Sequence, residues 1–147
     1  MVLPLLLIVM FGTLELGNFF MNEHTLVKAV RNGARFAARQ SFTQYPDCSS
    51  VSTALRDNTR NVVMNGYLSG GTIITPSIQA ADVTISTTCA ATAGGQNMTG
   101  IYTGRTNGAQ VVTVSANVDY RPLIGAIGFD AFNAELNAES EAAVMGL

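Results

Sequence analysis

The sequence predicts an α+β fold: a long N-terminal helix is followed by a small head with a second helix and an antiparallel sheet. The chain from Asn22 to Gln40 contains no proline, and its Ala, Arg, Leu and Lys residues favour helix. Residues 50–67 repeat apolar residues at helical spacing, and later segments alternate apolar and polar residues as strands do. We therefore divide the chain into a helix over residues 1–40 and a head over residues 41–147.

The first part of the long helix is suited to a membrane. Residues 1–21 are almost wholly apolar, with Glu15 as their only charge and Asn18 as their only amide. About 20 apolar residues span a bilayer as a helix. A helix from about Val2 to about Gln40 would be longer than the hydrocarbon core of about 30 Å, so nearly half of it should project beyond the core.

The second part of the helix is amphipathic. At 100° per residue its basic side chains share one narrow stripe, which consists of Lys28, Arg31, Arg35 and Arg39. Apolar and small residues line the opposite side, namely Leu26, Val30, Gly33, Ala34 and Ala37. The basic stripe has three interpretations: a solvated face, contact with lipid phosphates, or contact with acidic groups of neighbouring subunits. The small residues Gly33, Ala34 and Ala37 predict close approach of another element, with packing against the chain's own head as the alternative.

The head is predicted from local patterns. After the breaker at Tyr45–Asp47, a second helix is expected within Ser50–Tyr67. Strands are expected over residues 82–89 and 110–120 from their alternation. The turn signal Asn107-Gly108 predicts a hairpin between Ile101–Thr103 and the long strand. Residues 132–145 fit helix by composition and strand by alternation, and we predict a strand.

The two cysteines predict a disulfide. Cys48 and Cys89 belong to no CxxC pair and to no Cys/His cluster, so a metal site has little support. A bond between them would join the start of the second helix to the first strong strand. In an exported protein, closing this loop of about 40 residues would stabilise the fold by about 4 kcal/mol.

Composition argues against several classes of function. A net charge of −2 does not favour nucleic acid as a partner. The single histidine, His24, lies at the expected membrane exit, so we predict no catalytic residue, no cofactor and no metal. Glu135, Glu139 and Glu141 share a strand face, where they could bind Ca²⁺ or act as solvated edge charges, and the second interpretation is favoured.

Both ends of the chain resemble one family. The run VLPLLLIVMFGTLELGNFF from Val2 to Phe20, followed by VRNGARFAAR from Val30 to Arg39, resembles TadE-like pilin-like proteins of tight-adherence secretion systems. The run VVTVSANVDYRPLIGAIG from Val111 to Gly128 is similar to the family's later strand and the apolar-Gly sequence that follows it. Family members usually have a basic leader ending in glycine. No such leader precedes Met1, so we expect a mature or truncated product, or a different route of processing.

The resemblance implies a structural pilin-like subunit. It would be anchored in the inner membrane, processed by a prepilin peptidase and assembled by an ATPase-driven platform. Its partners would be copies of itself or other pilins, in an extracellular filament or a periplasmic pseudopilus. The alternative is a monomeric membrane-anchored extracytoplasmic binding domain, whose loops over Gly94–Gly108 would contact a ligand.

Glu15 requires a partner whether the chain is a filament subunit or a membrane-anchored binding domain. A carboxylate near the middle of a membrane helix costs about 2.5 to 3.5 kcal/mol on insertion scales. Lys28 is about 20 Å further along the same helix, so a pair within one helix is not possible. We expect a partner from a neighbouring subunit, either the amine of Met1 or Lys28, with local satisfaction or protonation in lipid as the alternative.

Overall fold

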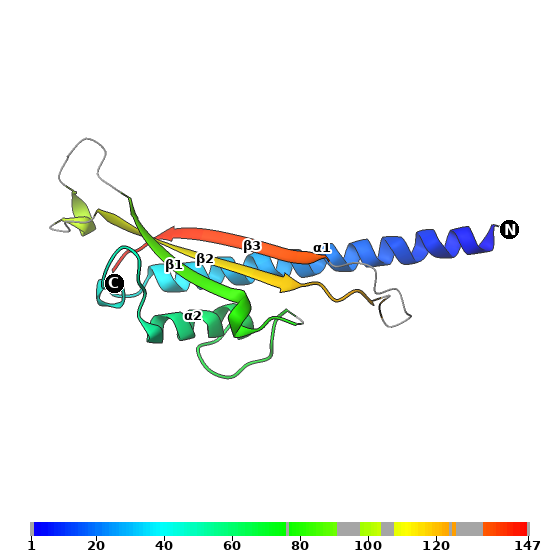
Figure 1. The fold of residues 1–147 in the computed structure, drawn as a ribbon, viewed down its shortest axis with the longest axis horizontal. Coiled ribbons are helices and arrows are strands. Elements are labelled where there is room, and N and C mark those ends of the chain that lie inside the picture. Colours follow the sequence, from blue (N-terminus) through cyan, green and yellow to red (C-terminus); the bar gives the residue numbers. More distant parts are fainter. Residues whose placement is uncertain are drawn as a thin grey trace.

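The computed structural model describes residues 2–75, 77–90, 98–103, 108–123, 125 and 134–146. The predictions that concern Met1, Gly94 and Asn107 fall outside these residues. The chain forms one long helix with a head packed along its C-terminal part, and the N-terminal part of the helix projects beyond the head (Figure 1). The predicted α+β class is confirmed.

Helix α1 (Leu3–Ala38) is continuous, as the absence of an internal breaker predicts. Its proline, Pro4, lies in the first turn, where a missing N–H costs no helical hydrogen bond. All residues from Val2 to Leu14 are exposed, whereas seven residues from Leu26 onward are buried. The helix therefore has an uncovered apolar half and a half that belongs to the core of the head.

Helix α2 (Thr53–Asn65) lies within the predicted range, and its ends have local causes. The Ser52 hydroxyl accepts a hydrogen bond from the Leu55 N–H, which satisfies a free donor of the first turn. Gly66 ends the helix in a left-handed conformation with φ of 76°, which glycine adopts without strain.

Three antiparallel strands form the sheet in the order β1-β2-β3: β1 (Val83–Ala90), β2 (Ala109–Asp119) and β3 (Glu135–Ala143). The strand interpretation of the C-terminal segment is thus confirmed for residues 135–143. The register places Val83 opposite Ala116 and Val114 opposite Ser140. This register sends every second residue of β2 toward α1.

The predicted hairpin between Ile101–Thr103 and the long strand is wrong. Residues Gly100–Tyr102 form the 3-10 helix η4, and β2 pairs with β1 on one side and β3 on the other. Eight residue pairs join β1 to β2, from Val83 with Ala116 to Ala90 with Ala109. A strand of three residues could pair with β2 over a much shorter length than β1 does. The local turn signal therefore did not determine the partner of β2.

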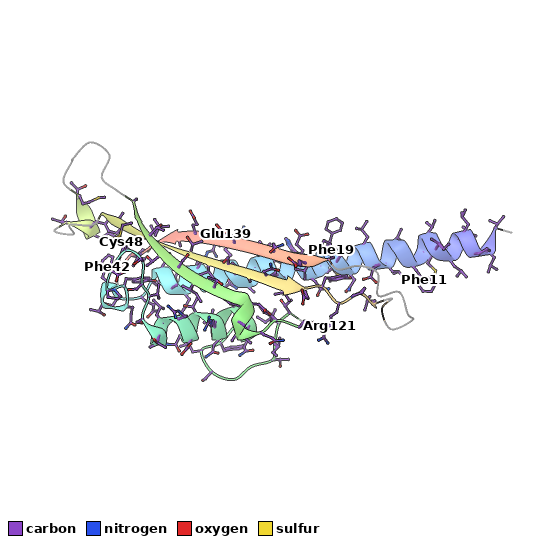
Figure 2. All side chains as sticks on the ribbon, viewed as in Figure 1. Phe11, Phe19, Phe42, Cys48, Arg121 and Glu139 are labelled. Atoms are coloured by element: carbon purple, nitrogen blue, oxygen red, sulfur yellow. A yellow bond between two sulfur atoms is a disulfide. The ribbon has the colours of Figure 1, made fainter. Side chains whose placement is uncertain are left out.

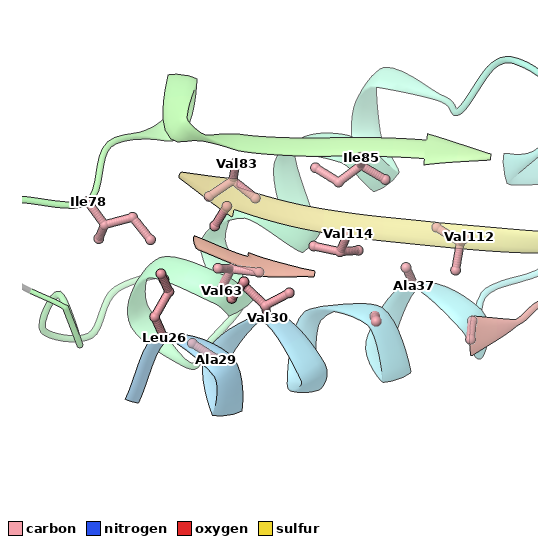
Figure 3. Packing of buried hydrophobic residues seen from close by; sticks show 14 of the residues in the cluster. Leu26, Ala29, Val30, Ala37, Val63, Ile78, Val83, Ile85, Val112 and Val114 are labelled. Atoms are coloured by element: carbon pink, nitrogen blue, oxygen red, sulfur yellow. The ribbon is translucent and has the colours of Figure 1, made fainter. Parts of the chain in front are cut away.

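The core lies between the sheet and the buried face of α1 (Figure 3). Val30 and Leu26 of the helix face Val114 and Val83 of the strands, and each of these four side chains is fully buried. The alternation of β2 therefore matches the apolar stripe of α1, as amphipathic packing requires.

Helix α2 approaches α1 at Gly33. A Cβ atom placed on Gly33 would overlap the side chain of Val63 and would also touch Thr59. Ala34 and Ala37 are buried on the same side of α1. Within one chain, the small-residue face is thus covered by the chain's own head, which is the alternative considered above.

Gly33→Ala is expected to destabilise the head, because Val63 is buried and must move to make room. Overpacking of this kind costs about 1 to 3 kcal/mol, against a gain of about 1 kcal/mol in helix propensity. The control is Gly17→Ala on the same helix, where an added Cβ meets nothing within 4 Å. Thermal unfolding in detergent should show a lower midpoint for Gly33→Ala alone. Equal midpoints for the two variants would contradict the close approach of α2.

The disulfide joins Cys48, in the loop before α2, to Cys89 near the end of β1. The sequence prediction of this bond is confirmed. Two other contacts hold the same region: the Tyr45 hydroxyl donates to the Ala37 carbonyl at 2.6 Å, and Gln110 Nε2 donates to the Asp47 carbonyl at 3.0 Å. The loop is thereby tied to both the helix and the sheet.

Candidate functional site

The polar residues of the apolar half of α1 lie on the side that the head covers. Glu15, Asn18 and Asn22 fall within about 60° of one another at 100° per residue. They continue the line of Leu26, which is buried against the sheet. The opposite side of this half, which includes Leu16, Gly17 and Phe20, is exposed.

Tyr120 connects the head to Glu15. It follows β2 directly and continues the inward-facing positions of that strand, so its side chain points toward α1 and is only 8% exposed. Its hydroxyl donates a hydrogen bond to the Glu15 carboxylate. The backbone N–H of Leu123 donates to the same Glu15 oxygen, Oε1, at 3.2 Å.

Two asparagines extend this arrangement along the helix. Asn18 Nδ2 donates to the Tyr120 hydroxyl oxygen at 2.8 Å, and Asn22 Nδ2 donates to Asn18 Oδ1 at 3.2 Å. The Tyr120 ring packs edge-on against Phe19, with 5.1 Å between ring centroids. We call Glu15, Asn18, Asn22 and Tyr120 the junction cluster.

The environment keeps the Tyr120 phenol protonated. Burial raises its pKa above the usual 10, and the hydrogen bond to the Glu15 carboxylate raises it further, while the bond from Asn18 acts in the opposite direction. At neutral pH the phenol is therefore a stable donor to Glu15. The chain itself thus supplies partners for Glu15. This is the local satisfaction considered as the alternative above, and a partner from a neighbouring subunit stays a prediction.

The four residues of the basic stripe are all exposed on the side of α1 away from the sheet: Lys28, Arg31, Arg35 and Arg39. Among the residues that the structure describes, the ion pair is Arg60 with Asp57 on α2, and none of the stripe residues takes part in one. His24 is exposed on the same side of the helix. The stripe is therefore available to a partner outside the chain.

The outer face of the sheet has the opposite charge. Asp119 of β2 and Glu135, Glu139 and Glu141 of β3 are exposed, and the register places them on the side away from α1. Glu139 is labelled in Figure 2. On this face Asp119 pairs with Glu135. The next two outward positions of β2 are neutral: Asn117 pairs with Asn137, and Ser115 pairs with Glu139. Within the described part of the chain, no group of three or more His, Cys, Asp or Glu is placed to hold a metal ion. The head therefore presents an acidic sheet face and a basic helix face on opposite surfaces.

Comparison with known proteins gives a family match for the N-terminal part of the chain. A family model described as TadE-like protein matches residues 1–35. The N-terminal segment is TadE-like. The resemblance predicted for this end is confirmed, whereas the resemblance over Val111–Gly128 lies outside the match and stays a prediction. No curated protein and no solved structure matches the chain.

The TadE-like match supports a pilus-related role for the chain. The matched segment contains Glu15 and most of the stripe, while Ala37 and Arg39 follow it. Among the described residues, α1 is the one helix long and apolar enough to cross a membrane, and none of its most apolar 18-residue window is buried. The segment is therefore compatible with an N-terminal membrane anchor.

Sequence reasoning missed Tyr120 as the partner of Glu15, although the TadE-like segment was recognised. The two residues are 105 positions apart, and no local spacing connects them. One signal was present: Val112, Val114, Ala116 and Val118 predict inward-facing positions, and Tyr120 is the next position with this parity. A buried tyrosine hydroxyl needs a polar partner, and the TadE-like segment has few polar side chains to offer.

Tyr120→Phe is expected to cost about 1.5 to 3 kcal/mol, the usual range for a hydrogen bond to a charged group. The matched control is Tyr102→Phe, because the Tyr102 hydroxyl donates to the neutral Val144 carbonyl at 2.7 Å. Removing that bond should cost only about 0.5 to 1.5 kcal/mol. Chemical unfolding in detergent measures both. In a Glu15→Ala background, Tyr120→Phe should lose most of its effect, and an undiminished effect would mean that the two side chains are not coupled.

Proposed function

We propose that this chain is a non-enzymatic structural subunit of a pilus-related filament or pseudopilus. It is anchored in the inner membrane by α1 before assembly, and then packs the N-terminal half of α1 in the core of the filament. One observation carries the proposal: the apolar residues from Val2 to Leu14 are uncovered in the single chain. A continuous apolar surface of this size requires lipid or protein to cover it.

The charge distribution supports contacts between copies of the chain. The basic stripe spans about 16 Å along α1 from Lys28 to Arg39. We call Glu135, Glu139 and Glu141 the acidic row, and it spans about 20 Å along β3. The C-terminal ends of α1 and β3 are level, because the Met145 N–H donates to the Ala38 carbonyl at 2.7 Å. Glu141 lies four residues, about 13 Å, before Met145, so the acidic residues lie further from this end than the basic stripe does. Two rows of similar length on opposite surfaces allow the helix face of one copy to meet the sheet face of the next, with the two copies offset along the axis of α1.

Such a contact uses different surfaces on its two sides. Contacts of this kind generate rings if they close and open helical assemblies if they do not. A filament is the natural product of the second case. Processing by a prepilin peptidase and assembly by an ATPase-driven platform follow from the family resemblance and are part of the proposal.

The test combines filament isolation with chemical cross-linking. Surface material is sheared from cells, imaged, and analysed by mass spectrometry for this chain. Lys28 is the only lysine, so a carbodiimide, which joins amines directly to carboxylates, has one side-chain target amine in each chain. We expect Lys28 joined to a peptide that contains Glu139 or Glu141. Within one chain these groups lie on opposite surfaces, so the product reports two copies.

The outcomes separate the proposal from its alternative. Filaments that contain this chain, with the Lys28 cross-link, support the structural role and the helix-to-sheet contact. A detergent-solubilised chain that stays monodisperse and is missing from sheared material and from pseudopili would favour the monomeric membrane-anchored binding domain.

A further inference from the structure

The head meets α1 within its apolar run, which continues to Met21 and is followed by Asn22, Glu23 and His24. A span of about 30 Å needs about 20 residues, and these three polar residues mark its C-terminal end. The junction cluster begins at Glu15, where the carboxylate is bonded to the Tyr120 hydroxyl and to the Leu123 N–H. Among the described residues of α1, Leu3–Leu14, about 18 Å of helix, lie before this contact and are exposed. The part of the head around Tyr120 therefore lies level with the last third of the span.

The residues at this level have the chemistry of a membrane interface. We call Tyr120–Leu123 the junction loop. Leu123 is 60% exposed, and it lies beside the apolar half of α1 because its N–H is bonded to Glu15. Tyr120 is amphipathic, and Arg121 is exposed at the same end of the head (Figure 2). Tyrosine and arginine are favoured at the level of lipid headgroups, and leucine is favoured below it.

We propose that the junction loop is a second membrane contact, which places the head directly on the bilayer. In the anchored state Leu123 enters the acyl region beside α1, and Arg121 lies at the phosphates. The partner is the lipid bilayer, and the contact continues the apolar surface of the helix. The inference rests on the membrane anchor of the proposed function and goes beyond it.

The same geometry explains how Glu15 is tolerated within the span. Polar groups in the hydrocarbon region must be satisfied by protein, because lipid offers no hydrogen bonds. The junction loop supplies a hydroxyl donor and a backbone donor to the carboxylate. Glu15, Asn18 and Asn22 all lie on the side that the head covers, so lipid contacts the apolar sides of α1. The head thus brings the donors for Glu15 into the membrane with it.

Tryptophan fluorescence tests this contact, because the chain contains no tryptophan. The full chain carrying Leu123→Trp is placed in nanodiscs whose lipids have brominated acyl chains, and its emission is compared with that in unbrominated nanodiscs. Ile101→Trp is the matched control: Ile101 is 58% exposed and lies in η4, at the opposite end of the head (Figure 1). Phe11→Trp, in the free part of α1, tests the anchor itself.

We expect the brominated lipids to quench Leu123→Trp and Phe11→Trp by at least about half, and to leave Ile101→Trp unchanged. Arg121→Trp gives a second position in the loop and should be quenched more by bromine near the headgroup than deep in the chain. If Phe11→Trp is quenched while both loop positions behave like Ile101→Trp, the anchor stands and the junction loop does not touch lipid. If Phe11→Trp is not quenched either, both the anchor and this inference are wrong.

Discussion

Chains that carry only Arg35→Glu are expected to form no filaments, and the same result is expected for Glu139→Lys alone. Arg35 lies in the basic stripe of α1, and Glu139 lies in the acidic row of β3. In the proposed contact the helix face of one copy meets the sheet face of the next. Either reversal puts a charge of the wrong sign into the contact, where it faces like charges of the neighbouring copy, and facing like charges cost several kcal/mol across an interface.

Co-expression of the two variants should restore assembly. The reversed helix face of an Arg35→Glu chain complements the reversed sheet face of a Glu139→Lys chain, and the other face of each chain is unaltered, so the two can alternate along a filament. The double variant Arg35→Glu/Glu139→Lys exchanges the two charges and should assemble by itself. Electron microscopy of sheared material, with mass spectrometry of the ratio of the two chains, measures this rescue.

A control of equal charge change separates the contact from net charge. Asp57→Lys on α2 changes an exposed side chain outside both surfaces and removes only an exposed ion pair, so it should leave filament yield unchanged. Normal filaments from both single variants would leave the filament role intact and rule out the helix-to-sheet contact. Loss of filaments without rescue in the mixture would indicate that these residues contact something other than each other.

Removal of the disulfide is expected to cause the largest loss of stability. Cys48 and Cys89 are 41 positions apart, and opening a loop of this length costs about 4 kcal/mol in the chain-entropy description. The variant Cys48→Ser/Cys89→Ser should therefore unfold at a clearly lower urea concentration in detergent than the unmodified chain. The unmodified chain treated with reductant should approach the variant, and the variant itself should not respond to reductant.

A small effect would also be informative. The loop that carries Cys48 is held by the Tyr45 bond to Ala37 and by the Gln110 bond to Asp47. If the free energy of unfolding of the variant falls by less than about 1 kcal/mol, there are two explanations. Either these two hydrogen bonds hold the loop in the folded state without the disulfide, or residual structure already confines the loop in the unfolded ensemble.

Periodicity predicted the parts of this fold that local sequence determines. The buried face of α1 was predicted from Leu26, Val30 and Gly33, because one face of a helix must be apolar to pack on a sheet. The inward side of β2 followed from alternation for the same reason. The cysteine pair could be predicted because only two cysteines are present.

The failures concern long-range pairing. The turn signal before β2 indicated a hairpin, but the partner of β2 was chosen by the longer ladder with β1. The partner of Glu15 depends on Tyr120, whose position is fixed only when the sheet has packed on the helix. The acidic face could be found from sequence, but its position opposite the basic stripe required the orientation of the sheet.

The order of the strands has a consequence for the way in which this protein matures. Strand β3 lies along α1, so the first and last elements of the chain pack together, and the Met145 N–H closes on the Ala38 carbonyl. Synthesis delivers α1 first and β3 more than 90 residues later. The part of α1 that β3 covers therefore stays uncovered until the C-terminal segment has been translated. A nascent chain that lacks β3 would leave part of that side exposed, and apolar surface exposed during folding favours aggregation.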